Sequence, residues 1–304
     1  MIPTADTVRP RGKLVSVPMD LQVKDRRLAV DHPLIMGIVN VTPDSFFDGG
    51  RFYDPQQAVA HALQLVEEGA DLLDIGAEST RPGALPVDEE EEHRRLIPVV
   101  AAVARAVPVP ISVDTSKAAV ARAAIDAGAV MINDVTALRG DATMVEVVAK
   151  TGAGLVLMHM QGTPETMQRS PHYDDVIEDI TRFLAERARF AMDRGVAHER
   201  IVLDPGIGFG KTLTHNVDLL ANLDAFLQLG FPLLVGPSRK GFIGQLTRQS
   251  PEGRAWGTAG AVALAVEHGA NILRVHDVAP MKDVVTVADA IARRMLPAGR
   301  EQHA

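Results

Sequence analysis

Polar side chains follow short apolar runs throughout this sequence, each directly after its run ends. Asp114 follows residues 111–113 and Asp204 follows residues 201–203. A carboxylate accepts two parallel N–H bonds, so two such groups beside an amide suit a donor-rich heterocycle that the residues alone do not name. Helix N-capping is the alternative explanation for one of the two aspartates. The groups after the other runs are Asn40, residues 78–81, Asn133 and Asp134, Met158 and His159, residues 238–240, and Arg274 with His276.

Three basic groups late in the chain have a spacing that suits phosphate. Arg274 and His276 are two positions apart, which places them on one face of a strand, and Lys240 belongs to the loop after the preceding run. A charge-assisted hydrogen bond from arginine contributes about 1.5–3 kcal/mol. We therefore expect a phosphate site here, with a solvated basic edge as the alternative interpretation.

The apolar runs alternate with helical patterns, which is typical of repeated βα units and a parallel sheet. Eight such units in a chain of 304 residues predict a (β/α)₈ TIM barrel. In that fold the active site forms at the carboxyl ends of the strands, and phosphate commonly binds after strands seven and eight. A doubly wound open sheet is the alternative. The predicted strands are 34–39, 72–75, 111–113, 130–132, 154–158, 201–203, 232–235 and 271–275.

The intervening segments carry helix patterns, and several precede a glycine suited to a helix C-terminus. Residues 14–30 alternate differently and predict a β-hairpin that closes the bottom of the barrel. The predicted organisation is an N-terminal extension over 1–30, a catalytic barrel over 31–298 and a loose tail over 299–304. The predicted helices include 55–68, 89–106, 117–127, 175–194 and 256–268, and the terminating glycines are Gly69, Gly128, Gly195, Gly230 and Gly269.

Composition excludes several classes of protein. The 31 Lys and Arg residues against 39 Asp and Glu residues give a net charge of −8, the wrong sign for a surface that binds nucleic acid. The absence of cysteine excludes disulfides, thiolate metal sites and cysteine nucleophiles. No segment offers the roughly 18 apolar residues of a membrane span, and the N-terminus lacks a signal-peptide core. We expect a soluble, cytoplasmic protein.

Three features of the sequence resemble functional motifs but are not interpreted as such. Gly210-Lys211-Thr212 ends like a phosphate-binding P-loop, but Pro205 stands where that motif needs its first glycine. The acidic run 88–92 is predicted to be the solvated first turn of a helix, favoured by the helix dipole. None of the ten histidines forms an HExxH or comparable metal cluster. A metal ion would therefore arrive with a phosphate ligand.

Six longer motifs follow one another within residues 34–278. They are NVTPDSF at 40–46, ESTRPG at 78–83, HMQGTP at 159–164, DPGIGFGK at 204–211, SRK at 238–240 and RVHD at 274–277. Together they resemble the dihydropteroate synthase family. The resemblance implies a (β/α)₈ transferase that condenses (7,8-dihydropterin-6-yl)methyl diphosphate with 4-aminobenzoate. The products would be diphosphate and 7,8-dihydropteroate, a step of folate biosynthesis.

The resemblance also implies roles for individual residues. The pterin pocket would comprise Asp114, Asn133, Met158, Asp204, Phe209 and Lys240. Diphosphate and its Mg²⁺ cofactor would contact Asn40, Arg81, Arg274 and His276, with Asn40 as the metal ligand. The 4-aminobenzoate site would comprise Phe46, Thr80, Pro82, Lys240 and Gly241. Phe47 and Gly241 stand where many members of the family have serine. These differences affect the expected detailed shape of the 4-aminobenzoate site.

These roles fit a dissociative, SN1-like substitution, because the dihydropterin ring can delocalise positive charge as diphosphate leaves. The resemblance further implies a homodimer formed through late barrel helices, and inhibition by sulfonamides. A pterin-binding methyltransferase domain is one alternative, but it has no use for a diphosphate site. A catalytically silent pterin-binding homologue is another. The predicted catalytic residues are Asp114, Asp204, Lys240, Arg274 and His276.

Overall fold

The structure, a computed structural model, describes residues 19–42 and 55–294. Within these ranges eight parallel strands form one sheet in the order β8-β7-β6-β5-β4-β3-β10-β9. A bridge between Leu203 and Leu233 joins the two edges and closes the barrel. The predicted (β/α)₈ barrel is confirmed and the open sheet is rejected. The strands are β3 Leu34–Asn40, β4 Leu72–Gly76, β5 Ile111–Asp114, β6 Met131–Asp134, β7 Gly154–Met158, β8 Ile201–Asp204, β9 Leu234–Val235 and β10 Ile272–Val275.

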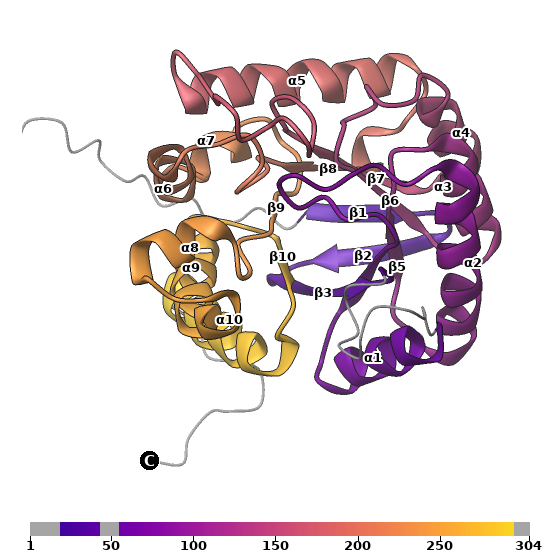
Figure 1. The fold of residues 1–304 in the computed structure, drawn as a ribbon, viewed down its shortest axis with the longest axis horizontal. Coiled ribbons are helices and arrows are strands. Elements are labelled where there is room, and N and C mark those ends of the chain that lie inside the picture. Colours follow the sequence, from indigo (N-terminus) through magenta and orange to yellow (C-terminus); the bar gives the residue numbers. More distant parts are fainter. Residues whose placement is uncertain (1–18, 43–54, 295–304) are drawn as a thin grey trace, which may run out of the picture.

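Helices surround the strands (Figure 1). The five predicted helices begin and end within one residue of the observed bounds, and the five predicted terminating glycines all have positive φ. Within the two described ranges no helix has the length and apolar character that a bilayer span requires. The helices are α1 Pro55–Glu67, α2 Glu89–Ala106, α3 Ala118–Asp126, α4 Met144–Thr151, α5 Val176–Asp193, α6 Leu213–Ala221, α7 Asp224–Leu227, α8 Gly241–Thr247, α9 Ala255–Glu267 and α10 Val278–Arg293.

A hairpin covers the amino-terminal end of the barrel, which confirms the prediction for residues 19–30; residues 14–18 of the predicted segment lie outside the described residues. Strands β1 Met19–Val23 and β2 Arg26–Val30 pair antiparallel. Leu21 and Val23 of this hairpin are fully buried against a cluster that includes Met36 and Leu72 from the barrel strands. Full burial of one such leucine contributes about 1.5–3 kcal/mol. The hairpin therefore closes one end of the barrel and leaves the carboxyl ends of the strands for a site.

The acidic first turn of α2 is only partly solvated. Asp88 caps the helix by accepting a 2.8 Å hydrogen bond from the backbone N–H of Glu91, and Glu89 and Glu90 are exposed. Glu92 is fully buried, so the prediction of a solvated run is wrong for this residue. The reason is helical periodicity, because position 92 lies on the same face as the buried Leu96.

Candidate active site

A narrow pocket lies at the carboxyl ends of the strands, where the barrel architecture places active sites. It contains all six residues predicted for the pterin pocket, together with Arg274. The cavity between these side chains has a volume of only about 10 Å³, so they lie close together. The lining residues are Asp114, Asn133, Val135, Met158, Asp204, Ile207, Phe209, Gly236, Lys240 and Arg274.

Arg274 lies among buried carboxylates inside the barrel and is not part of a solvated edge. Its Nε donates to Asp74 Oδ2 at 2.6 Å, and its Nη2 donates to Asp114 Oδ2 at 3.2 Å. The Nδ2 of Asn133 donates to the same Asp74 oxygen at 3.0 Å. Arg274 and Asn133 are thereby held together by one carboxylate.

Sequence reasoning missed Asp74, although the sequence carries a signal for it. A lone charged residue stands within the apolar run Leu72–Gly76 and is fully buried in β4. Such a charge is retained inside a strand only when a partner compensates it. The partner, Arg274, lies 200 positions away in the sequence.

Burial shapes the acidity of both pocket aspartates. It raises the pKa of Asp114, the neighbouring Asp74 adds to that effect, and Arg274 opposes it. Burial also raises the pKa of Asp204 to about 6, opposed by the backbone N–H of Gly206, which donates to Asp204 Oδ1 at 2.7 Å. Neither aspartate caps a helix: Lys117 occupies the N-cap of α3 and Thr212 that of α6, so the capping alternative is wrong.

An apolar wall faces these polar groups. Met158 and Phe209 belong to a buried cluster with Val135, Met160 and Met167. The ammonium of Lys240 stands 3.8 Å from the centroid of the Phe209 ring, within cation–π distance. Burial, reinforced by the neighbouring Arg274, lowers the pKa of Lys240 to about 7. Lys240 thus occupies the space over the face of the ring.

His276 stands beside this pocket as a neutral side chain. Its Nδ1 lies 3.0 Å from Ser238 Oγ, at the end of the neighbouring strand region. Burial, reinforced by Arg274 and Arg239, lowers its pKa to about 3. At neutral pH this imidazole can therefore meet a phosphate by hydrogen bonding and not as a cation.

The other described residues of the predicted site stand at or after the carboxyl ends of β3, β4 and β9 and do not line the pocket. Thr80 is half-buried, and Arg81 and Pro82 are exposed on the loop between β4 and α2. Arg81 is near enough to Lys240 to lower its pKa. Asn40 is half-buried at the last position of β3, and Gly241 is exposed at the start of α8. Phe46 lies outside the described residues.

The donor set fits a Mg²⁺ ion that arrives with its phosphate ligand. Among the described side chains no group of three His, Cys, Asp or Glu residues could hold a metal ion. Mg²⁺ prefers oxygen donors and usually combines one or two protein ligands with substrate phosphates and waters. The amide oxygen of Asn40, at the strand-end rim, is such a donor.

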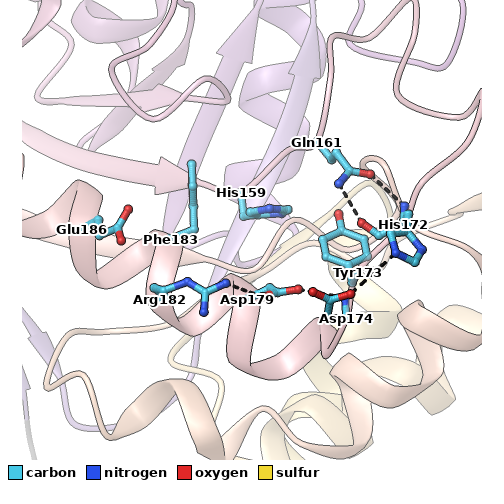
Figure 2. Close-up of a pocket in the computed structure, with 9 residues that line it drawn as sticks. All are labelled: His159, Gln161, His172, Tyr173, Asp174, Asp179, Arg182, Phe183 and Glu186. Carbon is cyan, nitrogen blue, oxygen red and sulfur yellow. Dashed lines mark hydrogen bonds and ion pairs between the residues drawn. The ribbon is translucent and has the colours of Figure 1, made fainter.

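A second, wider cleft of about 440 Å³ lies outside the barrel, next to α5 (Figure 2). His159 and Tyr173 line it, but both are engaged in holding the segment 204–211. His159 Nδ1 lies 3.0 Å from Lys211 Nζ, and the Tyr173 hydroxyl donates to the Gly210 carbonyl at 2.7 Å. Lys211 in turn donates to the carbonyl of Phe209 at 2.9 Å. These contacts hold in place the segment 204–211, which contains Phe209.

A closed βα barrel whose strand ends gather two buried carboxylates, an amide and an apolar wall suits a flat, donor-rich heterocycle. In agreement, the family described as "Pterin binding enzyme" matches residues 36–276. The fold and the site therefore define a pterin-binding enzyme.

Comparison with individual relatives identifies the family within the class of pterin-binding enzymes. The dihydropteroate synthase of Escherichia coli (strain K12) is 46% identical over 272 residues, covering 90% of this chain and 96% of its own. A structure of the Xanthomonas albilineans enzyme with 4-aminobenzoic acid is 50% identical, with a TM-score of 0.86 and coverage of 92% and 100%. A Yersinia pestis dihydropteroate synthase complexed with a sulfonamide drug is 46% identical, with a TM-score of 0.86 and coverage of 90% and 99%. The chain belongs to the dihydropteroate synthase family.

Proposed function

We propose that this protein condenses (7,8-dihydropterin-6-yl)methyl diphosphate with 4-aminobenzoate, giving 7,8-dihydropteroate and diphosphate. The observation that carries this is the pairing of two buried carboxylates, Asp114 and Asp204, with Arg274 and Lys240 in one pocket. The carboxylates suit the N–H groups of a pterin, and the cations suit its diphosphate. The 4-aminobenzoic acid complex of the Xanthomonas relative supports the second substrate.

Pterin recognition in this proposal uses the buried acceptors of the pocket. Asp114 and Asp204 accept N–H bonds from the ring, and Asn133 Oδ1 is a buried acceptor without a partner among the described residues. An unpaired buried acceptor is costly, so a donor-rich ligand is favoured there. Met158 and Phe209 pack on the ring, which requires the Lys240 ammonium to move off the Phe209 face.

The chain then favours departure of the diphosphate. The methylene C–O bond breaks, its electron pair leaves with diphosphate, and the positive charge spreads over the dihydropterin ring. Asp114 and Asp204 stabilise that charge, while Arg274 and Arg81 attract the leaving anion and neutral His276 hydrogen-bonds to it. The amine nitrogen next forms the C–N bond and loses a proton. No protein nucleophile is required.

Mg²⁺, when bound with the diphosphate, supplies charge neutralisation to the leaving group. Asn40 is the residue placed to hold it at the rim. The loop of Thr80, Arg81 and Pro82 is proposed to close over the bound substrates, where it would help exclude the water that competes with the amine. Phe46 is proposed to enclose the 4-aminobenzoate together with Gly241 and Lys240.

A homodimer is part of the proposal. Trp256 is 88% exposed and Leu264 is 57% exposed on α9, eight positions apart and hence on one helix face. Val287 and Ile291 are likewise exposed on α10, which packs against α9 (Figure 1). Large apolar side chains exposed on two adjacent helices suit a second copy of the chain.

A coupled assay for pyrophosphate tests the function. Purified protein, the pterin diphosphate, Mg²⁺ and 4-aminobenzoate should release pyrophosphate, and a sulfonamide should compete with the amine, as the Yersinia complex suggests. A methyltransferase domain or a silent homologue predicts no release. Omission of the amine tests the dissociative route. Cleaved pterin should then accumulate. Pyrophosphate release that strictly requires the amine would instead favour a concerted displacement.

A further inference from the structure

Lys117 joins the two ends of the loop between β4 and α2. Its ammonium bonds to the carboxylate of Glu78, two residues after β4 ends, and to that of Glu92 in the first turns of α2. Residues 79–88 lie between these two attachment points. Lys117 itself follows Asp114 by three positions, so the same contact connects the loop to the end of β5.

Burial makes this three-residue cluster different from the surface ion pairs of the chain. The Glu92 side chain is fully buried, and those of Glu78 and Lys117 are each 22% exposed. Burial raises the pKa of Glu92, whereas the Lys117 ammonium counteracts that effect. A buried carboxylate is retained only when a partner compensates its charge. Because breaking such a buried pair is costly, we expect Lys117 and Glu92 to stay in contact.

The clamped loop carries Thr80, Arg81 and Pro82, the residues proposed to meet 4-aminobenzoate and diphosphate. At its tip the backbone N–H of Gly83 donates to the Pro164 carbonyl at 3.0 Å, which joins the loop to another described segment of the chain. None of its residues lines the pterin pocket. The loop can thus shift without altering the pterin contacts, and its attachment points set where Arg81 stands.

We propose that Lys117 is a positioning residue: through Glu78 and Glu92 it holds the β4–α2 loop at the pocket mouth so that Thr80, Arg81 and Pro82 meet the amine substrate and the diphosphate. The proposal rests on the proposed function and adds a residue that touches neither substrate. It also gives the buried Glu92, predicted to be solvated, a role in the site.

The first test is kinetic. Lys117→Met should raise the KM for 4-aminobenzoate about tenfold, because small misplacement of positioning groups has large kinetic effects. Affinity for a diphosphate-free pterin, 6-hydroxymethyl-7,8-dihydropterin, should stay at the wild-type value. In Lys117→Arg the KM for 4-aminobenzoate should return most of the way to the wild-type value. Lys150→Met, which removes an exposed lysine paired with Glu146, is the matched control and should behave as wild type.

The second test separates positioning from stability. Lys117→Met leaves Glu92 buried without a cation, so its Tm should fall. Replacing both, in Lys117→Met with Glu92→Met, removes the unpaired charge and should recover Tm, while the KM for 4-aminobenzoate stays high because Glu78 is still unanchored. Glu78→Gln, which leaves Lys117 and Glu92 paired, should raise that KM with little loss of Tm.

Several outcomes would overturn the proposal. One is a wild-type KM in Lys117→Met; another is a KM that recovers together with Tm in the double variant. Equal losses of pterin and amine binding would also contradict it, because they would indicate general damage near Asp114. A wild-type protein without turnover would instead contradict the proposed function, so the two failures are distinguishable.

Discussion

Asp74 Oδ2 and Arg274 Nε are joined by a 2.6 Å hydrogen bond between residues 200 positions apart. Their strands, β4 and β10, are not neighbours; β3 lies between them. The pair therefore crosses the inside of the barrel. Because Asn133 donates to the same oxygen, this one carboxylate orients two side chains that line the pocket at the strand ends.

Removal of Asp74 should damage stability and the pocket together. Asp74→Ala leaves the buried Arg274 with a single carboxylate partner, and loss of one member of a buried pair costs about 3–5 kcal/mol. Denaturant unfolding measures the change. Asp20→Ala, which breaks an exposed pair with Arg27, is the control and should cost at most about 1 kcal/mol. Equal costs for the two variants would refute the role of Asp74.

Pterin affinity should rise with pH because of Asp204. Its pKa is raised to about 6, so the side chain is largely protonated at low pH and becomes a better acceptor for ring N–H groups as the pH passes that value. Calorimetry with a diphosphate-free pterin between about pH 5 and 7 checks this. Asp204→Asn should flatten this part of the profile and weaken binding by about 2 kcal/mol or more. An affinity that falls over this range would contradict the assignment.

Diphosphate affinity should depend on Arg274. Arg274→Ala removes charge-assisted contacts of about 1.5–3 kcal/mol, which corresponds to a loss of about ten- to a hundredfold in pyrophosphate affinity. Titration with pyrophosphate and Mg²⁺ measures it. Arg182→Ala, an exposed arginine of α5, serves as the control. Unchanged pyrophosphate binding in Arg274→Ala would exclude Arg274 from the diphosphate site.

Local patterns were sufficient to predict the barrel and the strand-end carboxylates and amide, whereas Met158, Phe209 and Lys240 were assigned to the pocket only through the family resemblance. Short apolar runs mark the strands, and a parallel barrel brings the residues after them, such as Asp114 and Asp204, to one end. Asp74 and Glu92 were missed because their roles come from long-range pairing. Asp74 meets Arg274 only when the barrel closes, and Glu92 meets Lys117 only when α2 packs beside the end of β5. A local sequence pattern cannot indicate either contact, because the two partners lie far apart in the sequence.

The dimer prediction depends on the exposed face of α9. Trp256→Glu places a charge in the proposed interface, where desolvating it is unfavourable, so the dimer should dissociate. Sedimentation or light scattering measures the mass at several protein concentrations. Met192→Glu, at a partly exposed position on α5, is the control and should leave the mass unchanged. A Trp256→Glu protein as dimeric as wild type would place any interface elsewhere.

The central claim is that this pocket joins a pterin to an arylamine. The most direct measurement incubates the full-length protein with Mg²⁺, the pterin diphosphate and isotopically labelled 4-aminobenzoate, and identifies the labelled product by chromatography and mass. The account predicts labelled 7,8-dihydropteroate in equal amount to the pyrophosphate released, and a strong decrease in both with Asp204→Asn. Pyrophosphate release without label in a pteroate product, or no turnover by the wild-type protein, would contradict it.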